Sequence, residues 1–396
     1  MKITGIISEY NPFHNGHLYQ INELRKRGTT HIVAVMSGNF VQRGDFALYN
    51  KFARAKAAVL CGADLVIELP TRFALSSAEN FAHGGVFLLD SLNVINELCF
   101  GSESGDTDGI KKAAELLSIN DIINDIKKLT KAGTPYPKAA ETILKNFGCE
   151  KFLTTPNDTL GVMYIKALQK LNSKITPNII LREGANHDSL LTPNSPLLTP
   201  HSSLLTKISS ASYIRNLTNK KEAKKYMPPP SYNEMLKTPN ASIENADRTI
   251  LARLRNKDFK NIADVSEGIE NRFKHAVNEA CSTEEIITLM KCGRYTNSRI
   301  RRLIMSAALD ITQEYAKTDP YYIRVLALNN KGSEILAESR KKAKLPKITS
   351  FAAATALGQE YREEFLKESS YSDFYALALP DIGKPSMDLV AKIDKL

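Results

Sequence analysis

Residues 2–17 read KITGIISEYNPFHNGH, a short apolar run followed by a turn and by two histidines that flank Asn15 and Gly16. The run from Ile3 to Ile7 is β-branched and uncharged, which is typical of a strand buried on both faces of a parallel sheet. Pro12 ends this run, and apolar residues then recur at helical spacing from Leu18 to Leu24. This stretch therefore predicts a strand, a turn and a helix in direct succession.

The two histidines, His14 and His17, are three residues apart and can project from one side of the first helical turn. A helix start presents free backbone N–H groups and the positive end of the helix dipole, which together bind anions. Gly16 has no Cβ, so a nucleotide can approach the backbone closely. We interpret the pair as donors to phosphate oxygens; ordinary loop or core histidines are the alternative. A zinc site is a weaker alternative because no cysteine pair lies nearby, and no metal ligand is assigned.

Strand-like and helix-like runs alternate through the first 100 residues. Strands are expected at Ile3–Ile7, His31–Met36, Leu65–Leu69 and Val94–Phe100, and helices from about Gly16, through Asp45–Cys61 and through Ser76–Leu92. This order predicts an α/β fold built on a doubly wound parallel sheet. Ligands of such sheets bind at the carboxyl ends of the strands, where His14 and the glycine-containing loops Gly38–Gly44 and Gly101–Gly105 are all expected.

The remainder of the chain is expected to be more helical. Helical patterns run through Thr107–Phe147 and Thr159–Leu171, a strand is expected at Ile175–Leu181, and residues 188–207 read as a loop. Three prolines from Pro228 to Pro230 mark a boundary, which predicts a catalytic domain of residues 1–227 and a second, mostly α domain of residues 228–396. The expected elements of the second domain are helices at Ser242–Leu254, Glu267–Glu279 and Thr283–Met290 and one strand-like run, Tyr321–Leu328.

Composition describes an ordinary globular protein, with 43% hydrophobic and 24% charged residues among 396. The N-terminus lacks a signal-peptide pattern, and no apolar run approaches the roughly 20 residues of a membrane span. Five scattered cysteines without a CxxC pair read as reduced thiols. We therefore expect a cytoplasmic protein that does not contact membranes.

The net charge of +10 is uneven: residues 1–200 carry 21 basic and 19 acidic side chains, and residues 201–396 carry 32 and 24. A basic second half suggests a polyanion partner, with solvated helix faces as the alternative. Basic residues interleaved with an aromatic suit nucleic-acid backbone contact and base stacking. The residues expected to do this are Lys291, Arg294, Tyr295, Arg299, Arg301 and Arg302, and a second basic run contains Lys341 and Lys342.

The motif His14-Asn15-Gly16-His17 resembles the signature of the HxGH nucleotidyltransferase superfamily. The longer spelling Gly5–His17, together with Met36–Gly44 and Leu69-Pro70, is similar to the bacterial tRNA(Met) cytidine acetate ligase family. The resemblance continues through Cys292–Thr296 and Lys341–Pro346, so it covers most of the chain. It is far more specific than HxGH alone.

This resemblance implies that acetate is activated by ATP to acetyl-adenylate, and that the acetyl group passes to N4 of the wobble cytidine of elongator tRNA(Met). It gives His14 and His17 the catalytic role. It implies ATP contacts from Ile7, Ser8, Glu9, Tyr10, Asn11, Pro12, Phe13, His14, Asn15, Gly16, His17, Leu18, Tyr19, Gln20, Gly101, Asn157 and Arg182. Mg²⁺ would suit the triphosphate, but no ligands for it are assigned.

Residues 209–215, SSASYIR, resemble the second phosphate-binding motif of the superfamily, commonly written ISSTxIR. Ala211-Ser212 departs from that spelling, so Ser209, Ser210 and Ser212 are all candidates for phosphate contact, with a plain N-cap as the alternative. The loop Gly38–Gly44 brings Asn39, Gln42 and Arg43 over acetate or the incoming base, or is an exposed connection. The acetate pocket has no assigned residues.

Two rival functions share parts of these patterns. A small-molecule adenylyltransferase has the same motif and sheet, but its substrates require no extended cationic surface. A non-catalytic RNA-binding protein would explain the basic half, but the intact His14, Gly16 and His17 count against it. An aminoacyl-tRNA synthetase is a further rival, because Lys207–Ser210 loosely echoes KMSKS.

Overall fold

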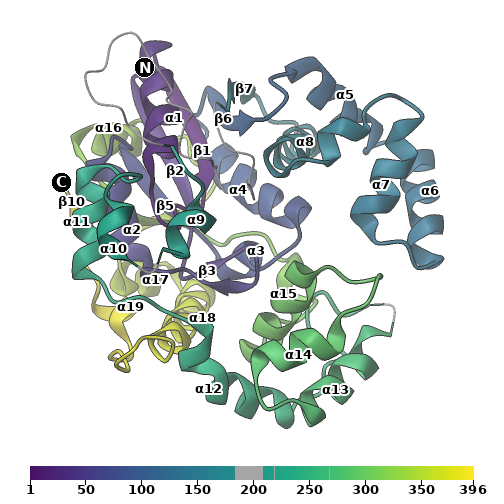
Figure 1. The fold of residues 1–396 in the computed structure, drawn as a ribbon. Coiled ribbons are helices and arrows are strands. Elements are labelled where there is room, and N and C mark those ends of the chain that lie inside the picture. Colours follow the sequence, from purple (N-terminus) through teal and green to yellow (C-terminus); the bar gives the residue numbers. More distant parts are fainter. Residues whose placement is uncertain (183–207, 218, 267) are drawn as a thin grey trace.

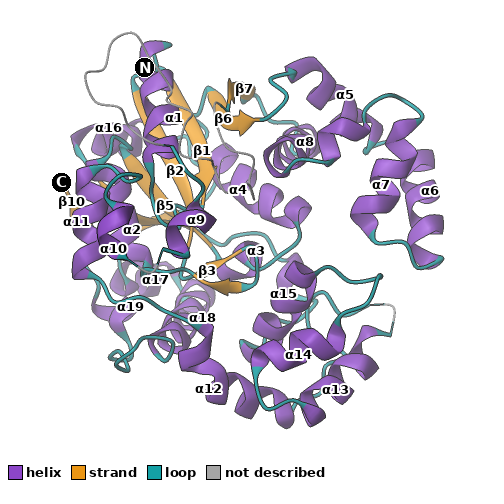
Figure 2. Cartoon of the chain, viewed as in Figure 1, coloured by secondary structure: helices purple, strands orange, loops and turns teal. Residues whose placement is uncertain are grey.

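The protein is described by a computed structural model that covers residues 1–182, 208–217, 219–266 and 268–396. The expected loop at 188–207 lies outside the described residues. An eight-stranded, mostly parallel sheet forms the centre of the fold, with helices on both of its faces (Figure 1, Figure 2). The predicted doubly wound α/β class is confirmed.

The strand order is β10-β8-β5-β2-β1-β6-β7, with β9 paired to β8. These strands are β1 (Ile3–Ser8), β2 (His31–Ser37), β5 (Leu65–Leu69), β6 (Glu97–Ser102), β7 (Thr176–Leu181), β8 (Ile323–Leu328), β9 (Lys347–Ile348) and β10 (Asp394–Lys395). A separate small hairpin pairs β3 (Phe40–Val41) with β4 (Asp45–Phe46). The expected helix at Asp45–Cys61 therefore begins later than predicted, after this hairpin.

Two hydrophobic cores cover the two faces of the sheet, and alternating residues of each central strand enter opposite cores. Val33 and Val35 of β2 pack with Leu88 and Leu89 on one face. Ile32, Ala34 and Met36 pack on the other face with helices that follow β1 and β4. Both faces are buried, which explains why these strands read as continuous apolar runs.

The helices of residues 1–182 are α1 (Asn15–Lys26), α2 (Lys51–Leu60), α3 (Thr71–Ala74), α4 (Ala78–Leu92), α5 (Thr107–Leu116), α6 (Asn120–Lys131), α7 (Tyr136–Lys145), η1 (Glu150–Leu153) and α8 (Pro156–Lys170). Later helices are α9 (Ala211–Arg215), α10 (Lys220–Ala223), α11 (Pro229–Lys237), α12 (Ile243–Arg255), α13 (Ile269–Glu279), α14 (Thr283–Met290), α15 (Asn297–Ala308), η2 (Tyr315–Lys317), α16 (Asn330–Glu338), α17 (Phe351–Leu357), α18 (Gln359–Ala376) and α19 (Met387–Val390). Each of these, within the described part of the chain, is too short or too polar to span a membrane.

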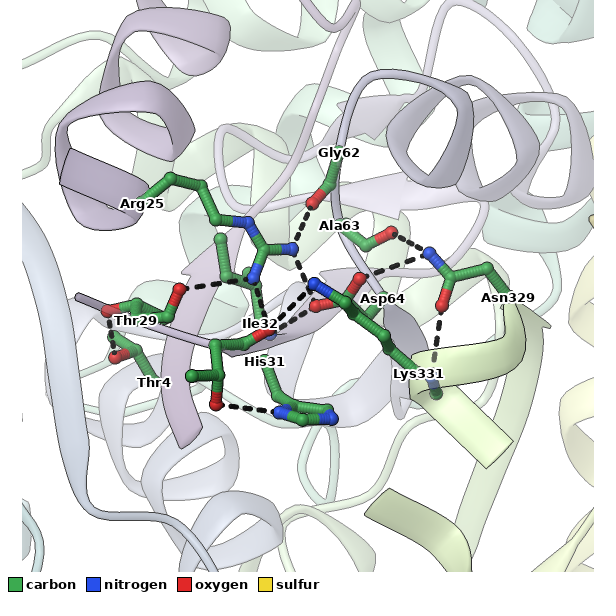
Figure 3. A network of polar contacts seen from close by, with 12 residues as sticks. Thr4, Arg25, Thr29, His31, Ile32, Gly62, Ala63, Asp64, Asn329 and Lys331 are labelled. Atoms are coloured by element: carbon green, nitrogen blue, oxygen red, sulfur yellow. Dashed lines mark hydrogen bonds and ion pairs between the residues drawn. The ribbon is translucent and has the colours of Figure 1, made fainter. Parts of the chain in front are cut away.

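The C-terminal part of the chain returns to the sheet. Strand β8 pairs antiparallel with β5, and β10 pairs with β8, so the sheet crosses the expected boundary at residue 228. Figure 3 shows the polar network that joins the two parts around Asp64. The Asp64 carboxylate accepts hydrogen bonds from Arg25, from the Ile32 amide and from the side chain of Asn329.

The helices α12 to α15 pack around a separate hydrophobic core that includes Ile250, Phe273, Ile287 and Ile304. This helical unit contacts the sheet domain through Phe40 and Phe46 of the hairpin, whose side chains belong to the same core. Gly44, between the two hairpin strands, lies against the backbone of α15 at Arg301 and Arg302. The hairpin therefore joins the carboxyl edge of the sheet to the basic helix α15.

Candidate active site

A pocket of about 650 Å³ opens at the carboxyl ends of β1, β6 and β7. Its wall combines the β1–α1 motif with Gly101, Asn157 and Arg182. The motif and these three residues come from four separate segments of the sequence. This is the position at which open parallel sheets bind ligands. The topology therefore brings the predicted nucleotide-contacting segments to one place.

His14 is the N-cap of α1, and its Nδ1 accepts a hydrogen bond from the Gly16 amide at 3.0 Å. His17 completes a capping box, because its Nδ1 accepts from the His14 amide at 3.1 Å. An Nδ1 that accepts a hydrogen bond carries no proton, so each neutral ring carries its proton on Nε2. The two rings are stacked with centroids 3.7 Å apart, and both line the pocket. The local fold thus sets both imidazoles as Nε2–H donors.

The electrostatic environment keeps His17 neutral. Burial lowers its pKa well below the ordinary 6.5, and the nearby His14 and Arg182 lower it further. Tyr10 and Phe13 pack against the His17 ring at centroid distances of 4.9 and 5.3 Å and fix its orientation. A neutral Nε2–H donor of fixed direction can donate a hydrogen bond to a phosphate oxygen.

Most residues of the predicted ATP-contacting stretch line the pocket, but some face the protein interior. The pocket wall includes Ile7, Ser8, Glu9, Tyr10, Asn11, His14, Gly16, His17, Tyr19, Gln20, Gly101, Asn157 and Arg182. Pro12, Phe13, Asn15 and Leu18 are absent from that wall. Phe13 is fully buried, and the Asn15 backbone amide donates to the Tyr226 carbonyl at 2.9 Å, so both residues are held within the protein.

Asn157 lies in the first turn of α8, whose N-cap is Thr155, so this helix begins before the expected start at Thr159. Its Nδ2 donates to Glu103 at 2.5 Å. The next residue, Asp158, is buried and accepts hydrogen bonds from Ser102 Oγ and from the amides of Glu103 and Ser104. Asp158 thus fixes the loop after β6, a role that its sequence position did not reveal.

The segment Ser209–Arg215 reaches the same pocket through α9. Ser210 is the N-cap, accepting from the Tyr213 amide at 3.2 Å, and Ser210 and Ser212 line the pocket whereas Ser209 is buried outside its wall. Arg215 also lines it and was missed as a site residue. Its guanidinium donates to the Asn11 carbonyl at 2.7 Å and to Ser212 Oγ at 3.0 Å. Arg215 therefore ties α9 to the β1–α1 turn.

The loop Gly38–Gly44 contributes Gln42 and Arg43 to the pocket wall. Asn39 was expected there, but its side chain is buried and contacts the Lys51 amide and Ser372 Oγ instead. The Gln42 amide donates to Glu9 Oε1 at 2.7 Å. The loop is therefore attached to the end of β1 rather than exposed.

The first basic cluster lies on α15 and on the turn before it. Lys291 is exposed, and Arg299 stacks on the Tyr295 ring at 5.2 Å. Arg301 pairs with Glu284 and its side chain is 27% exposed, whereas Arg302 pairs with Asp264 and is only 12% exposed. Ser298 in the first turn of α15 lines the pocket, so this cluster borders the site.

The second basic run lies at the other end of the sheet. Lys342 pairs with Glu338, and its carbonyl accepts from the side chain of Asn93, which precedes the start of β6. The strand starts are opposite to the edge that carries His14. Lys341 and Lys342 are exposed but do not border the pocket. Within the described ranges, no group of three or more His, Cys, Asp or Glu side chains could hold a metal ion.

A doubly wound sheet whose first strand presents an HxGH helix start to a basic pocket defines a nucleotidyltransferase of the HxGH class.

Comparison with known proteins narrows the class. A family model described as HIGH Nucleotidyl Transferase matches residues 1–384. A tRNA(Met) cytidine acetate ligase of Thermoanaerobacter sp. is 39% identical over 100% of both chains, and one of Clostridium perfringens is 39% identical over 89% of this chain and 91% of the relative. The crystal structure of Thermotoga maritima TmcAL bound with alpha-thio ATP has a TM-score of 0.89 at 31% identity, over 100% of both chains. The chain therefore belongs to the HIGH nucleotidyl transferase family and, within it, to the tRNA(Met) cytidine acetate ligases.

Proposed function

We propose that this protein is an ATP-dependent acetate ligase that forms acetyl-adenylate and transfers the acetyl group to N4 of the wobble cytidine of elongator tRNA(Met), giving N4-acetylcytidine. The observation that carries the proposal is the stacked pair His14 and His17, held as Nε2–H donors in a pocket beside a basic helix, in a chain of this family.

In the activation step, the acetate carboxylate attacks the α-phosphorus of ATP, and pyrophosphate leaves. His14 and His17 donate hydrogen bonds to phosphate oxygens on which negative charge grows. Arg182 and Arg215 offer planar forks that suit phosphate. Ser210 and Ser212, at the start of α9, are the members of the second motif that border the pocket and would meet the outer phosphates.

The remaining predicted nucleotide contacts fit the adenosine half of ATP. Gly101 is the second-last residue of β6 at the crevice, and a Cβ there would lie 3.2 Å from the Arg182 side chain. Asn157, oriented by Glu103, presents an amide to a base or ribose. We place adenosine between these two residues and the triphosphate over the α1 N-terminus.

In the transfer step, tRNA binds the helical unit α12 to α15. Lys291, Arg294, Arg299 and Arg301, with Tyr295, supply charge and an aromatic face beside the pocket. Arg302 is largely covered and positions the hairpin instead. Lys341 and Lys342 would reach only a distant part of the tRNA, because they lie at the opposite end of the sheet.

Mg²⁺ fits this site as a partner of ATP rather than of the protein. Of the described lining residues, only Glu9 carries a carboxylate, so a magnesium ion would be held mainly by phosphate oxygens and water. Its role would be to neutralise the charge of the triphosphate.

The decisive experiment incubates the purified protein with ATP, radiolabelled acetate and tRNA. Label is expected in elongator tRNA(Met) at the wobble cytidine and in no other tRNA. A small-molecule adenylyltransferase would instead leave tRNA unlabelled. A non-catalytic RNA-binding protein would bind tRNA but catalyse no acetate-dependent exchange of pyrophosphate into ATP.

A further inference from the structure

One carboxylate lies in a pocket that is otherwise positive. Among the described lining residues, Glu9 is the only acid, and it shares the wall with His14, His17, Arg43, Arg182 and Arg215. ATP and acetate are both anions, so a carboxylate here weakens their binding by Coulomb repulsion. Its presence therefore favours a role toward a substrate that is neutral and donates hydrogen bonds.

Glu9 is held from two sides. Its carbonyl accepts from Arg54 Nη1 at 2.6 Å, and this buried guanidinium also binds the carbonyls of Ser37, Gly38 and Tyr49. Its Oε1 accepts from the Gln42 amide at 2.7 Å. Within the described part of the chain, Oε2 makes no hydrogen bond or ion pair. The carboxylate is thus fixed in place with one oxygen able to accept a further hydrogen bond.

The pocket that contains Glu9 also has a surface that suits a flat heterocycle. Ala78, Phe81, Phe100, Leu160 and Tyr164 form an apolar section of the pocket wall, with the Phe100 and Tyr164 rings 5.6 Å apart. The negative charge of Glu9 contributes to the raised pKa of Tyr164, after burial, which places the phenol near this carboxylate. Aromatic and apolar walls of this kind receive bases that have been turned out of a nucleic-acid stack.

The same carboxylate is linked to the basic helix. The Gln42 amide donates to Glu9, and the Gln42 carbonyl accepts from Arg302 of α15 at 3.4 Å. Ser298 of the same helix lines the pocket. A nucleic acid bound on α15 would therefore present a base to the side of the pocket where Glu9 lies.

Resting on the proposed function, we propose that Glu9 is the catalytic base of the transfer step and binds the target cytosine through its N4 amine. N4 attacks the acetyl carbonyl carbon of acetyl-adenylate, and the new C–N bond forms. An N4 proton passes to Glu9 Oε2 as the bond between the carbonyl carbon and the phosphate oxygen breaks, and AMP leaves with that electron pair. Glu9 then returns the proton to solvent. A base is needed because the N4 lone pair is delocalised into the ring and nucleophilic only as its proton departs.

The test separates the two half-reactions in Glu9→Gln, which keeps an oxygen for the Gln42 amide but cannot accept a proton. Acetate-dependent exchange of pyrophosphate into ATP measures the effect of the substitution on activation, in which Glu9 lines the ATP pocket but no base is needed. Single-turnover transfer from enzyme-bound acetyl-adenylate to tRNA should fall roughly 100-fold or more. Hydroxylamine, which attacks acyl groups without a base, should trap the bound acetyl-adenylate equally fast in both proteins.

A matched control tests whether the effect depends on the position of the lost charge. Glu23→Gln, an acid on α1 that is absent from the pocket wall, is the matched control and should behave as wild type.

Three results would overturn the proposal. Transfer by Glu9→Gln within threefold of wild type would remove the catalytic role. Equal loss of exchange and transfer, restored by excess Mg²⁺, would make Glu9 a metal ligand of activation. Failure of the wild-type protein to label tRNA while acetyl-adenylate still forms would overturn the proposed function itself, and the Glu9 assignment with it.

Discussion

Gly44 lies against Arg302 so closely that a Cβ on residue 44 would overlap the Arg302 amide nitrogen. Gly44 has a φ of +75°, in the left-handed region that favours glycine. This contact is where the hairpin after β2 meets α15, and thus where the nucleotide pocket meets the basic helix.

Gly44→Ala should destabilise the protein and slow acetyl transfer. Alanine in this backbone conformation costs about 1 kcal/mol, and the overlap with α15 adds roughly 1–3 kcal/mol. Gly28→Ala is the matched control, because Gly28 also has a positive φ, +84°, but no atom within 4 Å of the added methyl. Urea unfolding of both variants checks this, and equal losses of stability would contradict the close packing.

His17→Ala should reduce acetyl-adenylate formation roughly 100-fold or more, because it removes a fixed donor to phosphate. Binding of tRNA should be largely retained, since the basic cluster is on another element. His83→Ala, a histidine of α4 that is absent from the pocket wall, is the control. Pyrophosphate exchange and tRNA binding are measured side by side. Exchange that survives in His17→Ala would show the phosphate role of His17 to be wrong.

Removing charge from the cluster beside the pocket should weaken tRNA binding more than removing it elsewhere. Lys291→Ala with Arg301→Ala should cost about tenfold in affinity and lower the slope of log K against log salt by about 2. Lys341→Ala with Lys342→Ala removes the same charge from the opposite end of the sheet. Similar effects of the two pairs on affinity would mean that position relative to the pocket does not matter.

Stability should depend on pH through Glu368 of α18. Burial, followed by the nearby carboxylates Glu68 and Glu364, raises the pKa of Glu368 to about 7 from the ordinary 4.5. Between these values the native state holds a proton that the unfolded state lacks, so the free energy of unfolding falls as pH rises, by on the order of 1–3 kcal/mol.

Glu368→Gln should flatten this dependence, because an amide side chain does not titrate. The amide can still bind the Thr71 backbone amide and hydroxyl, which contact Glu368 at 2.9 and 2.6 Å. Denaturant unfolding at pH 5 and pH 8 measures the difference. Glu363→Gln changes an exposed acid of the same helix and should leave the wild-type pH dependence intact. A Glu368→Gln variant with the same pH dependence of stability as the wild type would contradict a raised pKa of Glu368.

Local patterns predicted the parts of the fold that depend on neighbours in sequence. Strands β1, β2 and β5 and helices α1 and α4 follow from apolar periodicity and from Pro12, because each element buries its own pattern. The hairpin at Phe40–Phe46 was missed, since two-residue strands have too little periodicity to detect. The start of α8 at Pro156 rather than Thr159 was missed because its N-cap, Thr155, makes no side-chain cap bond.

Candidate site residues were also predicted incompletely where their position depends on distant parts of the chain. The sequence named Glu9 only as part of a stretch, did not name Arg215 as a site residue, and put Asn39 in the site. Whether a polar side chain faces a pocket or the interior depends on partners far along the chain, such as Ser372 for Asn39 and Asn11 for Arg215.

The sequence by itself determined the HxGH motif, the parallel sheet and the basic character of the second half, because these reside in residue types and short spacings. Only the tertiary structure decided that β8 and β10 complete the first sheet, that α15 borders the pocket, and that Lys341 lies at the opposite end. Such pairings join residues hundreds of positions apart. They are set by mutual burial and hydrogen bonding, which no short window of sequence contains.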